Sequence, residues 1–223
     1  MDAGFAPVGL VFETAPPPAR QRAPNTLRRV IEGIDTLAPE LRRVLLAPEE
    51  ALALSVTGAT DAAVLVPIYL ERGEPHAVFT RRREDLRRHA GEISFPGGRR
   101  DPGDADLMAT ALREAEEEVG LSPTAVEVSG ALQPTPTIAT GYAVYPFVGV
   151  IEAGMAWTLS PREVAEVIEL PLSTLRAGYG RRRLVRRGLP IRTDTYVVGD
   201  HLIWGATARI LADLFDRIAP LLT

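Results

Sequence analysis

Three absences limit what this chain of 223 residues can be. It has no cysteine, so disulfides and thiol chemistry are excluded. It has no lysine, so permanent cationic contacts to a phosphate have to come from its 25 arginines. Its longest apolar run, Ala62 to Leu70, is far shorter than the about 20 residues that a membrane-spanning helix needs. Met1 to Arg20 lacks the pattern of a secretory signal, and we therefore expect a cytoplasmic protein with no membrane partner.

The composition is that of a globular protein with a small net charge. Hydrophobic residues make up 46% and charged residues 24% of the chain, which argues against wholesale disorder. The net charge is −4 and aromatic residues are not interleaved with the arginines, so we do not expect a nucleic-acid partner. Arginines cluster within 81–88 and 181–187, and the first cluster is the better candidate for phosphate binding.

The organisation of the chain predicts one folded domain behind a flexible lead-in. Residues 1–24 end in a Pro-rich polar stretch, APPPARQRAP, which we expect to be extended or mobile. Residues 25–223 are expected to form a single domain. Helical decoration is expected at its start, with Asn25 capping one helix and Pro39 opening a second short helical stretch.

Strands and helices are expected in mixed order along the rest of the chain. The first two strands should form a hairpin, because turn-forming residues 71–75 separate them, and residues 96–104 should form a loop. The expected strands are 63–70, 76–81, 92–95, 125–132, 142–151 and 164–168, with shorter ones near Leu184 and at 196–198, and the expected helices are 105–119, ended by Gly120, and 204–218. This order predicts the α/β (α+β) class.

The expected helix 105–119 gathers carboxylates on one side. Glu114 and Glu118 are four residues apart and Glu117 is three from Glu114, so these three project together, whereas Glu116 points elsewhere. Like charges at this spacing destabilise a helix by about 0.2–0.5 kcal/mol per pair, which a bound cation would relieve. Carboxylate oxygens suit Mg²⁺, which is usually shared with substrate phosphates. The pattern fits a metal site, although taken alone it also fits a solvated acidic face.

The segment from Gly98 to Leu121 resembles the Nudix box, G-x5-E-x7-R-E-U-x-E-E-x-G-U, in which U is aliphatic. The first half departs from the pattern: Asp104 fills the acidic place, and eight residues rather than seven separate it from Arg113. The loop is thus one residue longer than the pattern. The second half agrees position by position, at Arg113, Glu114, Ala115, Glu117, Glu118, Gly120 and Leu121.

The segment before the box resembles the signature of the coenzyme A pyrophosphatase branch of this family, approximately L-L-T-x-R-[SA]-x3-R-x3-G-x3-F-P-G-G. Val78 and Phe79 replace the leucines, and Arg83 replaces the small residue, which is the larger departure. The residues in register are Thr80, Arg82, Arg87, Gly91, Phe95, Pro96, Gly97 and Gly98. Weaker likeness continues through 135–146, 163–172 and 203–211.

The resemblance implies a Nudix-type mixed β-sheet sandwiched between helices. It also implies hydrolysis of the phosphoanhydride bond of coenzyme A, or of its derivatives, to 3′,5′-ADP and 4′-phosphopantetheine. The implied cofactor is Mg²⁺ or Mn²⁺, held by the catalytic residues Glu114 and Glu118 with Glu117 as a third ligand. The general base is expected either from the box or from a later segment, in which Glu163 and Glu166 are the candidates.

Other residues are expected to contact or organise the substrate site. Arg82 and Arg87 are the expected phosphate contacts, because a guanidinium binds phosphate bidentately. Gly97 and Gly98 are expected to let backbone N–H groups approach the substrate, or else to serve turn geometry alone. Arg113 is expected to orient a neighbouring carboxylate.

Two other functions stay open at this point. One is hydrolysis of another nucleoside diphosphate derivative, such as ADP-ribose, NADH or a diadenosine polyphosphate. The other is a catalytically silent Nudix-like domain that senses a nucleotide, which the intact Glu114, Glu117 and Glu118 set disfavours. The expected partner is a small molecule in each case, and a homodimer is left open as the assembly.

Overall fold

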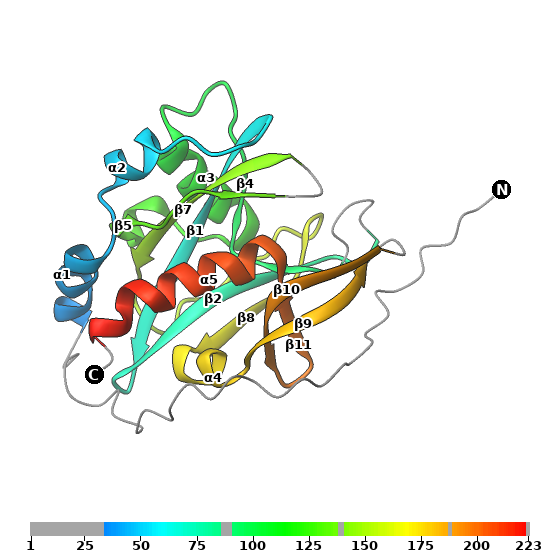
Figure 1. The fold of residues 1–223 in the computed structure, drawn as a ribbon. Helices are drawn as coiled ribbons and strands as arrows, with labels where there is room; N and C mark the ends of the chain where they lie inside the picture. The colour runs from blue at the N-terminus through cyan, green and yellow to red at the C-terminus, as the bar shows by residue number, and fades with distance from the viewer. Residues whose placement is uncertain (1–33, 86–90, 138–140, 187–188, 222–223) are drawn as a thin grey trace.

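The computed structural model describes residues 34–85, 91–137, 141–186 and 189–221 (Figure 1). The expected lead-in, the helix expected from Asn25 and the expected phosphate contact Arg87 lie outside these residues. In the described ranges, no helix has both the length and the apolar character needed to cross a membrane.

A mixed sheet of eight strands forms the centre of the fold. Its strand order is β3-β2-β1-β7-β5, with β4 paired to β1, β6 to β7 and β8 to β2. β1 and β7 run parallel, whereas the other strand pairs of this sheet are antiparallel. The strands are β1 (Thr60–Glu71), β2 (Glu74–Arg82), β3 (Ile93–Ser94), β4 (Gly97–Arg99), β5 (Glu127–Ala131), β6 (Thr135–Pro136), β7 (Tyr142–Val150) and β8 (Val164–Pro171).

Helices cover both faces of this sheet, so its central strands are buried on both sides. In β1, Val66 and Ile68 join the core cluster beneath α1 (Ile34–Val44) and α5 (Gly205–Ile218), whereas Ala63 and Leu65 join the cluster beneath α3 (Leu107–Val119). This alternation follows from the two-residue period of a strand. The expected sandwich of a mixed sheet between helices is therefore confirmed (Figure 1).

A second sheet lies beside the first and leads into the closing helix. It contains β9 (Tyr179–Arg186), β10 (Leu189–Val198) and β11 (His201–Trp204) in the order β11-β10-β9, and β11 continues directly into α5. Figure 1 shows α5 beside this small sheet. The remaining elements are α2 (Pro48–Ala53), α4 (Leu172–Ala177) and the short 3₁₀ turns η1 (Pro123–Ala125) and η2 (Ala219–Leu221).

Two of the predicted boundaries rest on local chemistry that the structure shows directly. The Asp106 side chain caps α3 by accepting from the Ala109 N–H at 2.7 Å, and Gly120 ends the helix with φ 72°. The hairpin between β1 and β2 turns through Arg72 and Gly73, which both have positive φ, as a tight two-residue turn requires.

Three expectations about the elements were wrong. Pro39 lies inside α1 rather than at the start of a helix, because the burial of Ala38 and Leu41 keeps the chain helical around it. Residues 97–99, expected in a loop, form strand β4 on β1. The strands near Leu184 and at 196–198 are much longer than expected, because β9 and β10 pair with each other over eight residues from Tyr179 to Arg186.

We expect Gly130→Ala to destabilise the fold. Gly130 sits at a register shift between β5 and β7 with φ 151°, and an added Cβ would lie 2.7 Å from Leu45 Cβ and 2.9 Å from the Leu46 carbonyl oxygen. The free energy of unfolding should fall by about 1–3 kcal/mol, as measured by urea denaturation. Gly103→Ala is the matched control, since nothing lies within 4 Å of its added Cβ. Equal stability of the two variants would contradict this account.

Candidate active site

Helix α3 presents its carboxylates at three different depths. The Glu118 side chain is 5% exposed, that of Glu114 is 17% exposed and that of Glu117 is 61% exposed. Glu116 is exposed on another side of the helix. The exposure of the three expected carboxylates thus increases from Glu118, which is buried, through Glu114 to Glu117, which is solvated.

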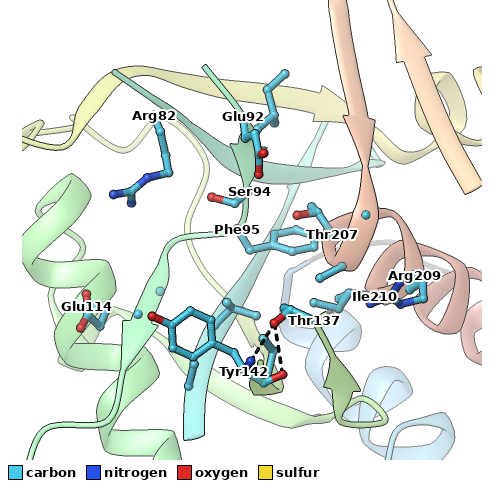
Figure 2. A pocket seen from close by; sticks show the side chains of 18 of the residues that line it. Arg82, Glu92, Ser94, Phe95, Glu114, Thr137, Tyr142, Thr207, Arg209 and Ile210 are labelled. Atoms are coloured by element: carbon cyan, nitrogen blue, oxygen red, sulfur yellow. Dashed lines mark hydrogen bonds between the residues drawn. The ribbon is translucent and has the colours of Figure 1, made fainter. Parts of the chain in front are cut away.

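A cavity of about 670 Å³ opens beside this helix. Arg82, Glu114 and Glu117 line one side of it, and Thr207, Arg209 and Ile210 from α5 line the other. Figure 2 shows Arg82 and Glu114 across the cavity from these α5 residues, with Phe95 and Tyr142 between them. A cavity of this size is in the range of about 300–1,000 Å³ that small-molecule sites occupy.

Glu118 lies behind the wall of this cavity rather than on it. Its carboxylate accepts from the Gly97 N–H at 3.3 Å and is 3.7 Å from the Arg82 guanidinium, and both partner residues line the cavity. Burial raises the pKa of Glu118 to about 8, while Arg82 and the Gly97 N–H act in the opposite direction. Burial also raises the pKa of Glu114, and there Arg113 opposes it. An added positive charge near these two carboxyls would therefore lower their pKa values and stabilise their ionised forms.

Arg113 connects the box loop to the carboxylates. It donates to Asp104 at 2.8 and 3.0 Å, and its guanidinium lies 3.0 Å from Glu114 and 3.1 Å from Glu117. The Asp104 carboxylate also accepts from Thr110 Oγ1 at 2.8 Å. The hydrogen bond between Arg113 and Asp104 lowers the pKa of Asp104 and raises that of Arg113, so this pair stays ionised. In the longer loop, Asp104 ties the loop to α3.

Strand β4 brings two glycines against the site. A Cβ on Gly97 would lie 2.4 Å from the Ala63 carbonyl oxygen, and a Cβ on Gly98 would lie 2.4 Å from the Glu114 carboxyl carbon. Gly97 therefore allows β4 to lie close to β1, and Gly98 leaves room for the Glu114 carboxylate. The Gly97 N–H is directed at Glu118.

The two candidate bases occupy different places. Glu163 lines the cavity, and its carboxylate is 3.8 Å from the Arg82 guanidinium. Glu166 is not among the described residues that line the cavity, and it pairs with Arg81 at 3.0 Å. Arg81 also contacts His201 Nδ1 at 2.7 Å. The structure thus brings Glu163, but not Glu166, to the carboxylate side of the cavity.

Several cavity residues were not singled out from the sequence. Thr137 and Tyr142 lie side by side, with Tyr142 N–H donating to Thr137 Oγ1 at 2.8 Å (Figure 2). Thr207 and Arg209 come from the start of α5. Each belongs to a stretch, 135–146 or 203–211, that has a weaker likeness to the coenzyme A branch. No spacing pattern in the sequence predicts that these two stretches meet in the fold.

The donor set fits a hard divalent cation shared with a ligand. Among the described residues, no three acidic or histidine side chains converge as a ready-made metal cage. Mg²⁺ does not need one, because it is usually bound by one or two carboxylates together with waters and substrate phosphates. Glu114 and Glu118 supply carboxylates that are neighbours on one helix face. Besides burial, Glu114 and Glu163 raise the pKa of Glu118, and Glu117 and Glu163 raise the pKa of Glu114.

Comparison with known proteins gives a consistent family likeness. A family model described as the NUDIX domain matches residues 59–187. A relative from Cronobacter sakazakii, "Uncharacterized Nudix hydrolase NudL", is 39% identical over 200 residues, which cover 89% of this chain and 97% of the relative. A NudL from Salmonella paratyphi B is 44% identical over 160 residues, covering 71% and 82%. Among solved structures, a MutT/nudix family protein from Enterococcus faecalis gives a TM-score of 0.51 at 12% identity, covering 75% of this chain and 64% of that one, a likeness of fold alone.

We expect Glu118→Gln to change how the stability of the metal-free protein depends on pH. Glu118 has a folded pKa of about 8 against an ordinary value of 4.5, so between these pH values the folded protein keeps a proton that the unfolded chain releases. As the pH rises through this window, the wild-type free energy of unfolding should therefore fall, relative to that of the variant, by up to about 1.4 kcal/mol per pH unit.

Urea denaturation in a chelating buffer from pH 5 to pH 9 measures this difference. The difference should grow up to about the folded pKa of 8 and then level off. Glu116→Gln is the matched control, because it makes the same substitution at an exposed position of the same helix. A constant difference for Glu118→Gln would contradict the raised pKa.

Proposed function

Because the chain belongs to the Nudix hydrolase family, we propose that it hydrolyses the phosphoanhydride bond of coenzyme A or its derivatives, giving 3′,5′-ADP and 4′-phosphopantetheine. The observation that carries the proposal is that the Glu114 carboxylate and the ion pair between Glu118 and Arg82 lie together at one side of a cavity large enough for a nucleotide. The reaction adds water across one P–O–P linkage, so one oxygen joins phosphorus as the bridging bond breaks.

In this proposal, Glu114 and Glu118 hold Mg²⁺ or Mn²⁺ and Glu117 is the third ligand. Such an ion, when bound, neutralises charge on the phosphate oxygens and lowers the pKa of water. Arg113 holds Glu114 and Glu117 in position through its contacts at 3.0 and 3.1 Å. A rigid helix and one shared guanidinium thus fix the directions of the carboxylates before substrate enters.

Arg82 and Glu163 have the next roles in the proposal. Arg82 lies between Glu118 and Glu163, at 3.7 and 3.8 Å, and reaches the cavity from the end of β2. It is placed to contact the pyrophosphate and to balance the charge of the two acids. Glu163 is half exposed and accessible to water, so we assign it as the general base.

Coenzyme A is favoured over other nucleotides by the signature before the box and by the walls of the cavity. Arg82, Phe95, Gly97 and Gly98, which are in register with that signature, all line the cavity. Its middle is walled by aromatic and aliphatic side chains such as Phe95 and Tyr142 (Figure 2). An apolar wall suits either the adenine ring or the pantetheine arm.

The proposed reaction is tested by incubating the purified chain with Mg²⁺ and a panel of coenzyme A, ADP-ribose, NADH and diadenosine polyphosphates. We expect kcat/KM to be at least about tenfold higher for coenzyme A than for the others, a difference of about 1.4 kcal/mol in the transition state. Mass spectrometry should find 3′,5′-ADP and 4′-phosphopantetheine. A higher kcat/KM for any other member of the panel would overturn the assignment of the substrate, but the assignment of the reaction as phosphoanhydride hydrolysis would stand.

Glu118→Gln and Glu116→Gln form a matched pair for the proposed metal ligands. Both remove one charge from α3, but Glu118 is buried next to the site whereas Glu116 is exposed away from it. We expect Glu118→Gln to lower kcat by about 10³-fold or more at saturating Mg²⁺, and Glu116→Gln to stay within about threefold of wild type. Circular dichroism should show both variants folded. Near-normal turnover by Glu118→Gln would sink its assignment as a ligand.

A further inference from the structure

The end of the cavity opposite the carboxylates is formed by the start of α5. Trp204, Gly205 and Ala206 line the cavity there, and the helix has no side-chain cap at its N-terminus. The first N–H groups of a helix have no partner within the helix, and together with the helix dipole they favour an anion. These donors therefore face the space that a ligand would occupy.

A buried polar side chain points into the same space. Thr207 is 8% exposed, and its hydroxyl forms no hydrogen bond with any of the described residues. Figure 2 shows this hydroxyl directed into the cavity, which Ser94 and Phe95 also line. Because this hydroxyl opens to the cavity and has no partner in the described part of the chain, water or a ligand has to satisfy it. The unpartnered Thr207 hydroxyl therefore points to a ligand independently of the helix N-terminus.

Arginine gives this end of the cavity a positive charge. Arg209 lines the cavity and is half-buried, and it donates to the Pro136 carbonyl oxygen. None of the described acidic side chains forms an ion pair with it. Arg192, an exposed residue of β10, lines the cavity as well. Glu92 also lines the cavity, and the Asp194 carboxylate, which interacts electrostatically with Arg209, lies 3.5 Å from Arg181.

We propose that the first turn of α5, together with Thr207 and Arg209, forms a second anion subsite that takes a phosphate monoester of the ligand. Resting on the proposed function, this group is the 3′-phosphate of coenzyme A. Arg82 is held between Glu118 and Glu163 on the other side of the cavity, where the pyrophosphate binds in the proposed reaction. In this arrangement, Arg82 contacts the pyrophosphate and Arg209 contacts the 3′-phosphate, so arginines from different parts of the chain bind the two anionic groups of the substrate.

The subsite is tested by calorimetric binding of 3′,5′-ADP and 5′-AMP, which differ only in the 3′-phosphate. We expect the wild type to prefer 3′,5′-ADP by at least about tenfold, within what one charge-assisted hydrogen bond contributes. Arg209→Gln should remove most of this preference, Arg209→Lys should keep part of it, and Thr207→Val should reduce it. Arg176→Gln is the control, because Arg176 is exposed at the end of α4 and does not line the cavity.

The possible results separate this inference from the proposed reaction. Equal binding of the two nucleotides by the wild type, or an unchanged preference in Arg209→Gln, overturns the subsite even if coenzyme A is hydrolysed. An Arg209-dependent preference in a chain that does not cleave coenzyme A supports the subsite and overturns the reaction. If Arg209→Gln does not fold, Thr207→Val takes its place, since Thr207 belongs to the proposed subsite and valine has nearly the same shape, and a preference that Thr207→Val leaves unchanged overturns the subsite.

Discussion

The burial of the Glu118 carboxylate is the constraint on which the rest of the site depends. A carboxylate that is 5% exposed has lost most of its hydration, and from the described part of the chain a backbone N–H at 3.3 Å and a guanidinium at 3.7 Å compensate for it. Glu114 and Glu163 add repulsion. The metal-free site therefore has a deficit of positive charge at one defined point. In the proposed function, a cation bound together with a substrate phosphate would meet that deficit without creating an excess of charge elsewhere.

The glycines of β4 make this burial possible. Side chains at both positions would collide with β1 and with Glu114, so α3 could not bring its acids this close to the sheet. Arg113 then fixes the other edge of the carboxylate group through Asp104, which the longer loop supplies. The substitution of Asp for Glu and the extra loop residue are thus compatible with an anchored loop. The ion pair between Asp104 and Arg113 anchors the longer loop to α3.

The sequence predicted most of what is local and little of what is distant. Helix α3, its end at Gly120 and the β1–β2 hairpin follow from spacing and turn chemistry within a few residues. The pairing of β4 with β1 could not be foreseen, because a Pro-Gly-Gly run is typical of a loop and only the opposing strand makes it a strand. For the same reason the motif identified Glu114 and Glu118 as a pair, but not their difference in depth. That difference is set by β2 and β4.

The two sides of the cavity come from different parts of the chain, and this division bears on how substrate selectivity is built. The segment that matches the family model ends at residue 187 and contains the carboxylates, Arg82 and Glu163. The opposite side is supplied by β10, β11 and α5, which follow that segment. In the proposed function, the shared segment cleaves the phosphoanhydride, and in the proposed subsite the later segment selects ligands that carry a further phosphate. Substitutions around Thr207 and Arg209 would alter the ligand without touching the group of acids that performs the proposed chemistry.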